Sequence, residues 1–478
     1  MNTLPRHLTV AILACLTASC VSLAPALPSI EAPEASVLDE SAAGTDDAQS
    51  VLSIDTLIRS DQLRRLIHTG ILNNRDLRVA SLNMVKVREM YRIQGAELFP
   101  QVDLFTQGSS ARAPVHGADA NGLSRTYGGG MSVASWELDL FGRVRSLKDA
   151  ALERYLASSA ARRSVELALV AQIATSYLQL AADQQQLALA DQTYTSRRSA
   201  YELQQELAAA GISSSLEINR AAAELEEIAD NLLKWRAAVQ QSRNGLQLLV
   251  GTGLDPELKA EPIEQILADE LPIGHLSSVV LASRPDVKAS EHELLASNAD
   301  IGAARAAFFP SISLTGAYGS QSSELRSLFD SGTKAWSFVP QISLPIFSGG
   351  RLRASLRATT TERDAALARY EGAVQSAFRE VSDVLVDRSV LGDRVASRER
   401  QVAAADASLD AIGDRYASGV ATQIELLDAQ RTLFSAESEL ITIRLQQRLN
   451  AIDLYRVLGG GRDNPLSPME GRSELTKR

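Results

Sequence analysis

Proline is absent from two long stretches of this 478-residue chain, residues 115–255 and 346–464. Within the first stretch nothing interrupts a helical pattern from residue 144 to 209, because glycine is also missing there. Proline and glycine are the residues that most disfavour a helix interior. A helix of about 66 residues is about 100 Å long at 1.5 Å per residue, far longer than a globular domain needs. The chain is therefore predicted to build an elongated helical structure.

Each long helix is predicted to end at a glycine and to be followed by a second helix. Gly211 lies in "AAGISSSLEI", where the serines offer N-caps for a helix from 216 to 250. In the second stretch a helix from 352 to 417 ends before Gly419, and a threonine can cap a helix from 424 to 458. Both halves of the chain therefore predict a long helical hairpin.

The two halves are copies of one unit, because matching landmarks keep a nearly constant separation. The separation is 210 residues up to the Phe-Pro pair and 208 residues from Arg143 onward. The pairs are Asp76 with Asp286, Phe99-Pro100 with Phe309-Pro310, Arg143 with Arg351, Gly211 with Gly419, Glu217 with Glu425 and Gly251 with Gly459. Each copy reads helix, two strands, very long helix, turn and helix.

Alternating apolar residues after each Phe-Pro pair predict strands with one apolar side. At about ten residues or more, these segments are long enough for tilted membrane-spanning strands. Trp136 and Trp336 suit an interfacial aromatic belt, and Gly128–Gly130 is expected to be a loop feature. A half-buried soluble sheet would show the same alternation. The expected strands cover residues 101–112, 126–141, 311–320 and 335–347.

The second strand of each copy runs into its long helix through a similar sequence, "WELDLFGRVR" and then "PIFSGGRLRA". Glycine permits the backbone turn, and a proline within a strand pattern removes a ladder hydrogen bond and marks the strand's exit. The Arg-x-Arg pairs suit polar surroundings at the membrane edge. We predict a strand-to-helix swivel formed by Gly142, Arg143, Pro345, Gly349, Gly350 and Arg351.

Four strands in one chain cannot close a barrel. An open sheet edge in lipid would leave backbone groups without hydrogen bonds. The chain is therefore predicted to associate with copies of itself, in a number that the strands alone do not fix.

Composition excludes several classes of function. The net charge of −10 argues against a nucleic-acid binder, which would show a basic face. After residue 30 no stretch approaches the roughly 18–20 apolar residues of a membrane-spanning helix. The five histidines are scattered without metal-ligand spacing, and no phosphate-binding loop or G-x-S-x-G motif occurs. We expect no enzyme activity, no metal site and no cofactor.

The N-terminus has the pattern of a bacterial secretory signal, residues 1–19, with Arg6 ahead of an apolar run. The signal ends in "LTASC", which resembles a bacterial lipobox and predicts lipidation of Cys20. Cys15 is a competing position, and an ordinary cleaved signal with an incidental cysteine is the other alternative. The mature chain then has too few cysteines for a disulfide framework.

Several long, ordered motifs give the chain a family resemblance over about residues 55–460. They are "WELDLFGRVR", "PIFSGGRLRA", "AAGISSSLE", "RYASGVATQIELLDAQRTL" and "LYRVLGGG". Together with the duplication they resemble the outer-membrane factors of Gram-negative bacteria, the TolC-like ducts. The similarity is greatest to the lipoprotein branch that serves RND-type multidrug efflux pumps.

The resemblance implies a mainly α fold with membrane β-strands, assembled as a homotrimer. Three chains would form a twelve-strand β-barrel in the outer membrane and a twelve-helix α-barrel extending into the periplasm. The periplasmic tip would meet an adaptor (membrane fusion) protein attached to an inner-membrane RND-type transporter. The protein would be a passive, gated conduit for drugs or other small molecules, in contact with outer-membrane lipid.

The resemblance also implies where the duct closes. In relatives the tip is closed just after the turn between the last two helices, and Ile424 and Asp428 occupy those positions. Being four residues apart, they share a helix face. The 208-residue offset gives Leu216 and Arg220 as their counterparts in the first copy. Arg220 is expected to pair with a nearby Asp428 and to help hold the tip shut.

A lipid-anchored periplasmic coiled-coil adaptor or structural protein is the main alternative. It would share the helical hairpins but would lack two pairs of membrane-length strands. The predicted organisation is a signal peptide at 1–19, a lipidated leader at 20–55, a first repeat at 56–251, an equatorial connector at 252–275, a second repeat at 276–459 and a disordered tail at 460–478.

Overall fold

The computed structural model of the chain describes residues 23–27, 54–112, 123–268 and 279–460. Its residues form two compact units. Of the described residues, the sheet unit contains 83–112, 123–159 and 289–372 together with leader residues 23–27. The helical unit contains residues 54–82, 160–268, 279–288 and 373–460. Cys20 and the C-terminal tail lie outside the described residues.

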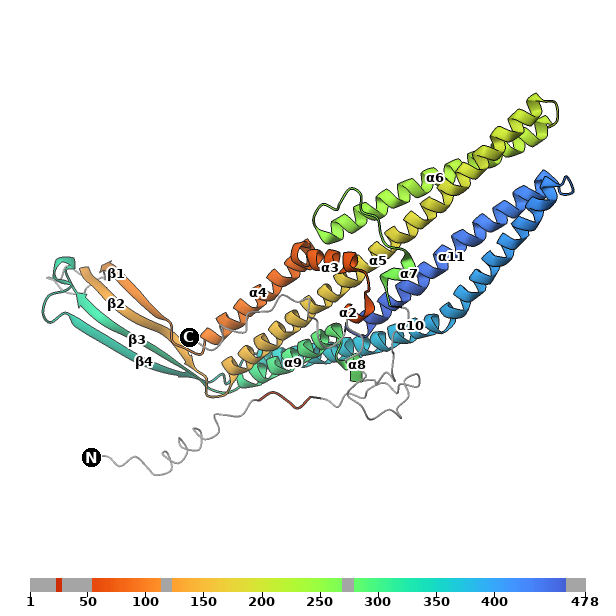
Figure 1. Cartoon of the computed structure of the whole chain (residues 1–478). Helices are drawn as coiled ribbons and strands as arrows, with labels where there is room; N and C mark the ends of the chain where they lie inside the picture. Colours follow the sequence, from red (N-terminus) through yellow and green to blue (C-terminus); the bar gives the residue numbers. More distant parts are fainter. Residues whose placement is uncertain (1–22, 28–53, 113–122, 269–278, 461–478) are drawn as a thin grey trace. The chain divides into compact units, whose positions relative to one another are not determined.

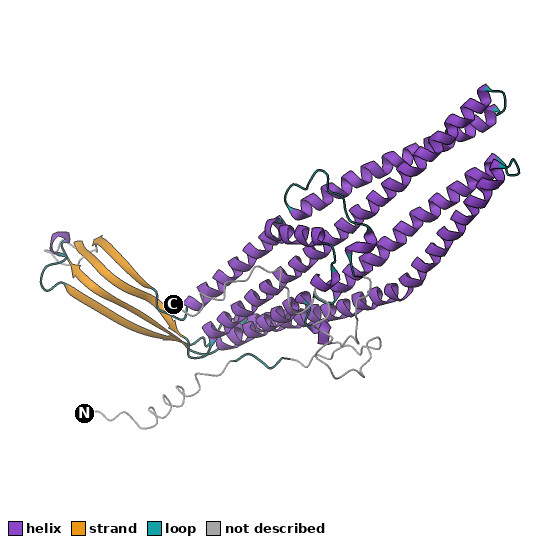
Figure 2. Ribbon diagram, viewed as in Figure 1, coloured by secondary structure: helices purple, strands orange, loops and turns teal. Residues whose placement is uncertain are grey.

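The secondary structure repeats one order twice (Figures 1 and 2). Short helices α2 (Ile54–Leu57), α3 (Asp61–Asn73), α7 (Ile263–Ile266) and α8 (Val279–Ala282) accompany the two copies. The first copy is α4 (Arg75–Ala96), β1 (Val102–Arg112), β2 (Leu123–Leu138), α5 (Arg143–Ala209) and α6 (Ser215–Val250). The second is α9 (Pro285–Ala306), β3 (Ser311–Ser322), η2 (Leu325–Ser327), β4 (Lys334–Ser343), α10 (Arg351–Ala417) and α11 (Gln423–Val457).

The long helices begin and end where the proline and glycine pattern predicts. Helices α5 and α10 have 67 residues each. Helix α6 starts with a capping box, in which Ser214 and Glu217 bond each other's backbone N–H, and α11 starts with the same arrangement of Thr422 and Glu425. These boxes satisfy N–H groups that a helix start leaves unpaired. The duplicated sequence therefore folds into two equivalent hairpins.

The four strands form one antiparallel sheet in the order β1-β2-β3-β4. A bulge interrupts the pairing of β2 with β3 between Val133 and Trp136, where Ser135 has a φ of 49°. One extra residue in a strand reverses which side chains face which way. Val133 and Trp136, three residues apart, thereby lie on the same face of the sheet. The simple alternation in the sequence did not reveal this shift.

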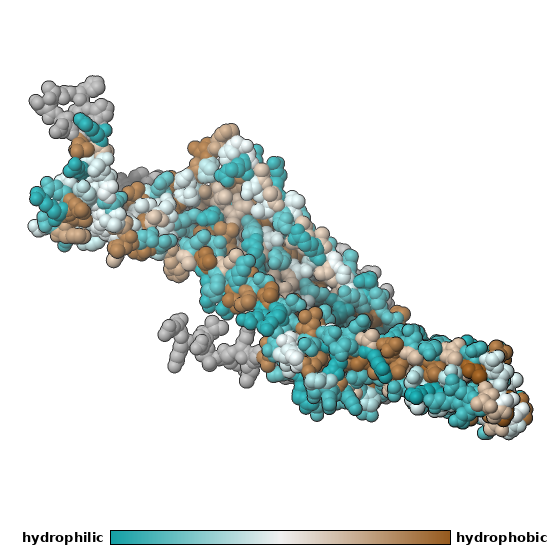
Figure 3. All heavy atoms as spheres, turned by 90° about the horizontal axis from the view of Figure 1, so that it is seen from above, coloured by the Kyte–Doolittle hydropathy of each residue, from teal (hydrophilic) through white to brown (hydrophobic). Residues whose placement is uncertain are grey.

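One face of the sheet is apolar along its whole width. The register places Leu104 opposite Met131 and Tyr318 opposite Trp336 on this face. Several of its side chains are exposed, including Trp336 at 76%. Figure 3 shows hydrophobic residues at the surface of the sheet in one view. The indole N–H of Trp136, by contrast, is buried and has no hydrogen-bond partner in the described chain.

The expectation that Gly128–Gly130 form a loop feature is wrong, because all three lie within β2. A Cβ on Gly130 would stand 2.3 Å from the carbonyl oxygen of Tyr318, and a Cβ on Gly319 would stand 2.2 Å from that of Gly129. The backbones of β2 and β3 therefore approach too closely here for any side chain on either glycine.

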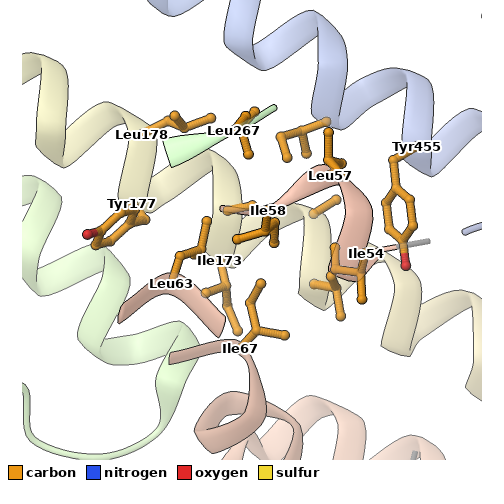
Figure 4. Packing of buried hydrophobic residues seen from close by; sticks show 14 of the residues in the cluster. Ile54, Leu57, Ile58, Leu63, Ile67, Ile173, Tyr177, Leu178, Leu267 and Tyr455 are labelled. Atoms are coloured by element: carbon orange, nitrogen blue, oxygen red, sulfur yellow. The ribbon is translucent and has the colours of Figure 1, made fainter. Parts of the chain in front are cut away.

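The core of the helical unit is built from residues far apart in the sequence (Figure 4). Ile58 and Leu63, around the start of α3, pack with Ile173 and Tyr177 of α5. The phenol of Tyr177, whose ring is fully buried, donates a hydrogen bond of 2.5 Å to Gln62 Oε1. Burial of large apolar side chains is the main stabilising contribution to such a cluster.

One described helix, α5, contains a window long and apolar enough to cross a membrane by composition alone. The sequence pattern had predicted none after residue 30. Since 67% of that window is buried within the protein, it has the character of a core helix rather than of a lipid-exposed span.

Candidate functional site

The two helical hairpins end in turns of matching geometry. Gly211 and Gly419 have φ values of 77° and 71°, which favour glycine. Ile212 donates its N–H to Leu207 O, and Val420 donates to Arg415 O, closing each helix in the same way. Each turn leads directly into a capping box, so the first residues of α6 and α11 are held at fixed positions.

Three of the four predicted gate residues lie in one place in the helical unit. Arg220 on α6 and Ile424 and Asp428 on α11 line a shallow pocket, which we call the gate pocket. Leu216 does not line it; this side chain lies one helical turn nearer the start of α6 and is 58% exposed. Ile424 is 55% exposed. The complete lining is Arg220, Ala223, Glu224, Ile424, Leu427, Asp428 and Arg431.

The partner of Asp428 within the chain is Arg431, not the predicted Arg220. Arg431 Nη2 lies 2.6 Å from Asp428 Oδ1, one turn along the same helix. In the described part of the chain Arg220 forms no hydrogen bond or ion pair, and its side chain is exposed. An Arg220–Asp428 pair would therefore have to form between two chains. The partner Arg431 was missed, although its spacing of three residues from Asp428 is one that favours ion pairs on a helix.

A partly buried ion pair extends from the gate pocket, because one of its partners, Glu224, lines the pocket. Arg197 on α5, only 6% exposed, pairs with Glu224 on α6. Burial raises the pKa of Glu224, and the attraction of Arg197 opposes the rise without cancelling it. Two charges of the gate pocket also act on Glu224: Arg431 lowers the pKa of its carboxyl, and Asp428 raises it. Neither Arg197 nor Glu224 was predicted, because nothing local in the sequence shows that α5, α6 and α11 meet here.

Polar and apolar contacts join the two hairpins near the turns. Gln204 Nε2 donates to the hydroxyl of Tyr416 at 3.2 Å, linking α5 to α10. Further along, Phe434 of α11 packs against a small core formed by Ala190, Ile228 and Leu232. Near the turns the hairpins are thus connected through a few separable contacts, whereas further from the turns all four helices contribute to the main core.

In the sheet unit, the first strand-to-helix connection is fixed by two acid–arginine pairs. Glu137 accepts two hydrogen bonds from Arg143, at 2.9 and 2.7 Å, and Asp139 Oδ2 accepts from the backbone and side chain of Arg145. Bidentate pairs of this kind fix geometry as well as charge. The repeated acids and arginines of "ELDLFGRVR" therefore clamp the turn at Gly142, whose φ is 75°.

The second connection has the same course without the clamp. Its turn contains Gly349 and Gly350, with φ values of 60° and 87°. Pro345 and Arg351 line a cavity of about 330 Å³ that Arg143 also lines. The first copy's acids have no counterparts here, and in the described chain Arg351 forms no ion pair.

No described residues form a cluster of three or more metal-ligating side chains. The described site thus consists of two helical turns with a charged pocket and two strand-to-helix connections.

Comparison with known proteins gives a consistent match. The model of the family "outer membrane efflux protein" matches residues 66–252 and 276–460, the two copies of the repeat. The antibiotic efflux pump outer membrane protein ArpC of Pseudomonas putida is 40% identical over 448 residues, 91% of this chain and 92% of that protein. Outer membrane protein OprJ of Pseudomonas aeruginosa is 38% identical over 480 residues, 98% of this chain and 97% of that protein.

The fold matches as well. The open-state structure of the MtrE outer membrane channel of Neisseria gonorrhoeae superposes with a TM-score of 0.82 and 35% identity, covering 91% of this chain and 98% of that one. The sheet and the duplicated long helices exclude the coiled-coil alternative. The chain therefore belongs to the family of outer membrane efflux proteins and is a TolC-like outer-membrane channel of an efflux pump, not an enzyme.

Proposed function

We propose that the protein works as a homotrimer, a passive and gated conduit that receives small molecules from an inner-membrane RND-type transporter through a periplasmic adaptor protein. Antibiotics and organic solvents are the proposed cargo, since relatives are named for pumps that export antibiotics and toluene. The observation that carries the proposal is the four-stranded sheet, with an apolar face and two unpaired edges.

The duplication provides a register for closing those edges. Within the chain, Trp136 pairs with Leu314 at the contact between the two copies of the repeat. Trp136 lies close to Arg143, where the two copies are 208 residues apart, and Leu314 lies close to Pro310, where they are 210 residues apart. Adding 208 to the first residue and subtracting 210 from the second gives Leu344 opposite Leu104 of the next chain. The neighbouring pair, Leu138 with Ile312, maps in the same way onto Ile346 opposite Val102. All four mapped side chains are exposed in the single chain.

Three chains would bring three copies of the gate pocket around one axis. The three Ile424 side chains would form an apolar ring beside a ring of three Asp428 carboxylates. Leu216 and Arg220 of the first copy would lie between the second-copy residues of neighbouring chains. We assign Arg220 to Asp428 of a neighbouring chain, because its own Asp428 is held by Arg431. The strand-to-helix connections at Gly142 and at Gly349 would act as swivels when the helices move.

Membrane attachment through lipid at Cys20 is part of the same proposal. The lipobox-like sequence supports it, and residue 20 lies close in sequence to leader residues that contact the sheet unit. The protein would then be both anchored in and inserted through the outer membrane, with its helices in the periplasm.

Disulfide trapping tests the trimer and its register together. Val102→Cys combined with Ile346→Cys should give a species of three linked chains on non-reducing gels of outer membranes. The control combines Val102→Cys with Ile342→Cys, which lies four residues from the mapped position and should not cross-link. A cross-linked dimer, or protein found only in the soluble fraction, would overturn the proposal. Restored drug resistance in a host without its own channel tests the conduit separately.

A further inference from the structure

Leader residues 23–27, drawn as a short red segment in Figure 1, are held by one face of helix α9. Asn298 Nδ2 donates a hydrogen bond of 2.8 Å to Pro25 O, and Arg305 Nη1 donates one of 3.0 Å to Leu23 O. With Gly302 between them, these residues stand at spacings of four and three, so they share a helix face.

Gly302 lets the leader lie directly against the helix. A Cβ at this position would stand 3.0 Å from the backbone nitrogen of Ala24 and 2.8 Å from the hydroxyl of Ser146 on α5. A larger side chain that is not bonded to the leader would push the leader away or displace Ser146, whereas a disulfide to residue 24 requires this close approach. The leader therefore lies directly against Gly302, with the polar side chains of Asn298 and Arg305 on either side of it along α9; we call this helix face the docking groove.

The direction of the leader in this groove is defined. Leu23 lies beside Arg305, and Pro25 lies beside Asn298, two helical turns further from strand β3. The chain thus approaches the sheet as it runs back toward its N-terminus. Ser311, the first residue of β3, is six residues beyond Arg305. Helix α9 ends at Ala306, but helical turns continue to Phe309, so the rise from Arg305 to Ser311 is about 9 Å. Cys20 is three residues before Leu23, about 10 Å if extended, so it can reach the level where β3 begins.

The position of Asn298 allows the hydrogen bond to the leader but lowers the stability of the folded state. Its side chain is buried, and its Oδ1 has no hydrogen-bond partner in the described chain. A buried amide that is only half satisfied destabilises the folded state relative to an apolar residue. Replacing it by Ala therefore removes the bond to the leader without removing an interaction that α9 needs.

We propose that Asn298, Gly302 and Arg305 form a docking groove for the chain's own leader, and that this groove sets the height of residue 20 at the entry of the strands into the membrane. The position of acyl chains rests on the proposed lipidation of Cys20, whereas docking of residues 23–27 does not. The groove would keep the lipid anchor and the sheet at one membrane level.

Thiol trapping in full-length protein tests the docking. Ala24→Cys with Gly302→Cys should form an intrachain disulfide in purified protein, detected because two polymer-linked maleimides attach only after reduction. The matched control is Ala24→Cys with Ser297→Cys, since the Ser297 hydroxyl bonds only Glu293 O on its own helix. We expect the control disulfide to form at least about tenfold more slowly. Equal rates, or no disulfide at Gly302, would overturn the proposal.

A second measurement avoids altering Gly302. Maleimide labelling of Ala24→Cys should become about tenfold faster when Asn298→Ala and Arg305→Ala remove both hydrogen bonds. Ser297→Ala should leave the labelling rate unchanged. An unchanged rate in the double variant would refute docking through these side chains.

Cys20→Ser separates this proposal from the proposed function. Docking predicts that the disulfide between Ala24→Cys and Gly302→Cys still forms when Cys20→Ser is present. Its loss would show that the lipid, and not the groove, positions the leader. Interchain cross-linking and drug resistance, measured on the same protein, report on the trimer and conduit independently of either result.

Discussion

Replacing Gly130 by Ala should weaken the pairing of β2 with β3 in every chain. The added Cβ would stand 2.3 Å from Tyr318 O and 2.6 Å from the Cα of Gly319, whereas real Cβ contacts essentially never fall below 3.0 Å. The strands must therefore separate by at least 0.7 Å, the difference between 3.0 and 2.3 Å. Both obstructing atoms belong to the backbone, so no side chain can rotate away.

Overpacking of this kind costs about 1–3 kcal/mol per site. With three chains in the proposed barrel the cost would be about 3–9 kcal/mol per assembly, enough to lower the yield of assembled protein severalfold or more. The assay is the temperature at which detergent-resistant oligomers dissociate on gels. Gly128→Ala is the matched control, because its Cβ would meet only side-chain atoms at 3.5 Å or more within this sheet. Equal dissociation temperatures for Gly130→Ala and Gly128→Ala would refute the reasoning.

Four further outcomes are expected. Asp428→Ala should raise outer-membrane permeability to a large antibiotic severalfold by removing the proposed carboxylate ring, and unchanged susceptibility would contradict that role. Thr422→Ala should destabilise the start of α11 by about 1 kcal/mol, seen as faster hydrogen exchange at the turn. The hydrogen bond from the backbone N–H of Thr422 lowers the pKa of the Glu425 carboxyl. The stabilisation of the α11 start by ionised Glu425 should therefore be present above about pH 4.3 and be lost as the pH falls through the lowered pKa. Glu425→Gln should flatten this pH dependence in the same hydrogen-exchange experiment. Tyr177→Phe should lower the stability of the helical unit by about 1 kcal/mol in chemical denaturation by removing the hydrogen bond to Gln62.

The helices could be read from the sequence because their signals are local. Gly211 and Gly419 mark the turns, and the serine and threonine caps lie where the structure has its capping boxes. The bulge at Ser135 could not be read in this way. It depends on how β2 meets β3, about 180 residues later in the chain, and it keeps Trp136 on the apolar face. The close approach of the β2 and β3 backbones at Gly130 depends on the same long-range pairing.

The sequence predicted those parts of the candidate site whose residues could be found from the duplication and the family resemblance. The repeat and the family resemblance placed Ile424, Asp428 and Arg220 together, and the structure shows them lining one pocket. The repeat and the family resemblance did not show which charged side chains form ion pairs within the chain. The pair of Arg197 with Glu224 joins two helices whose relative register is set by packing far from the turn. Such a pair has no signature in the local sequence.

The two copies of the repeat diverge where the chain must distinguish its own contacts from those with a neighbour. In the first copy Arg143 is clamped by Glu137, and Phe141 stacks on Phe309 of the second copy with ring centroids 4.9 Å apart. In the second copy the clamp is absent and Phe347 is 92% exposed. The first connection is therefore completed within the chain, whereas the second presents apolar side chains that the described part of the chain leaves exposed. A duplicated unit that closes one junction internally and leaves the equivalent junction open has the asymmetry that the proposed ring of identical chains needs, because each open junction could be completed by the next chain.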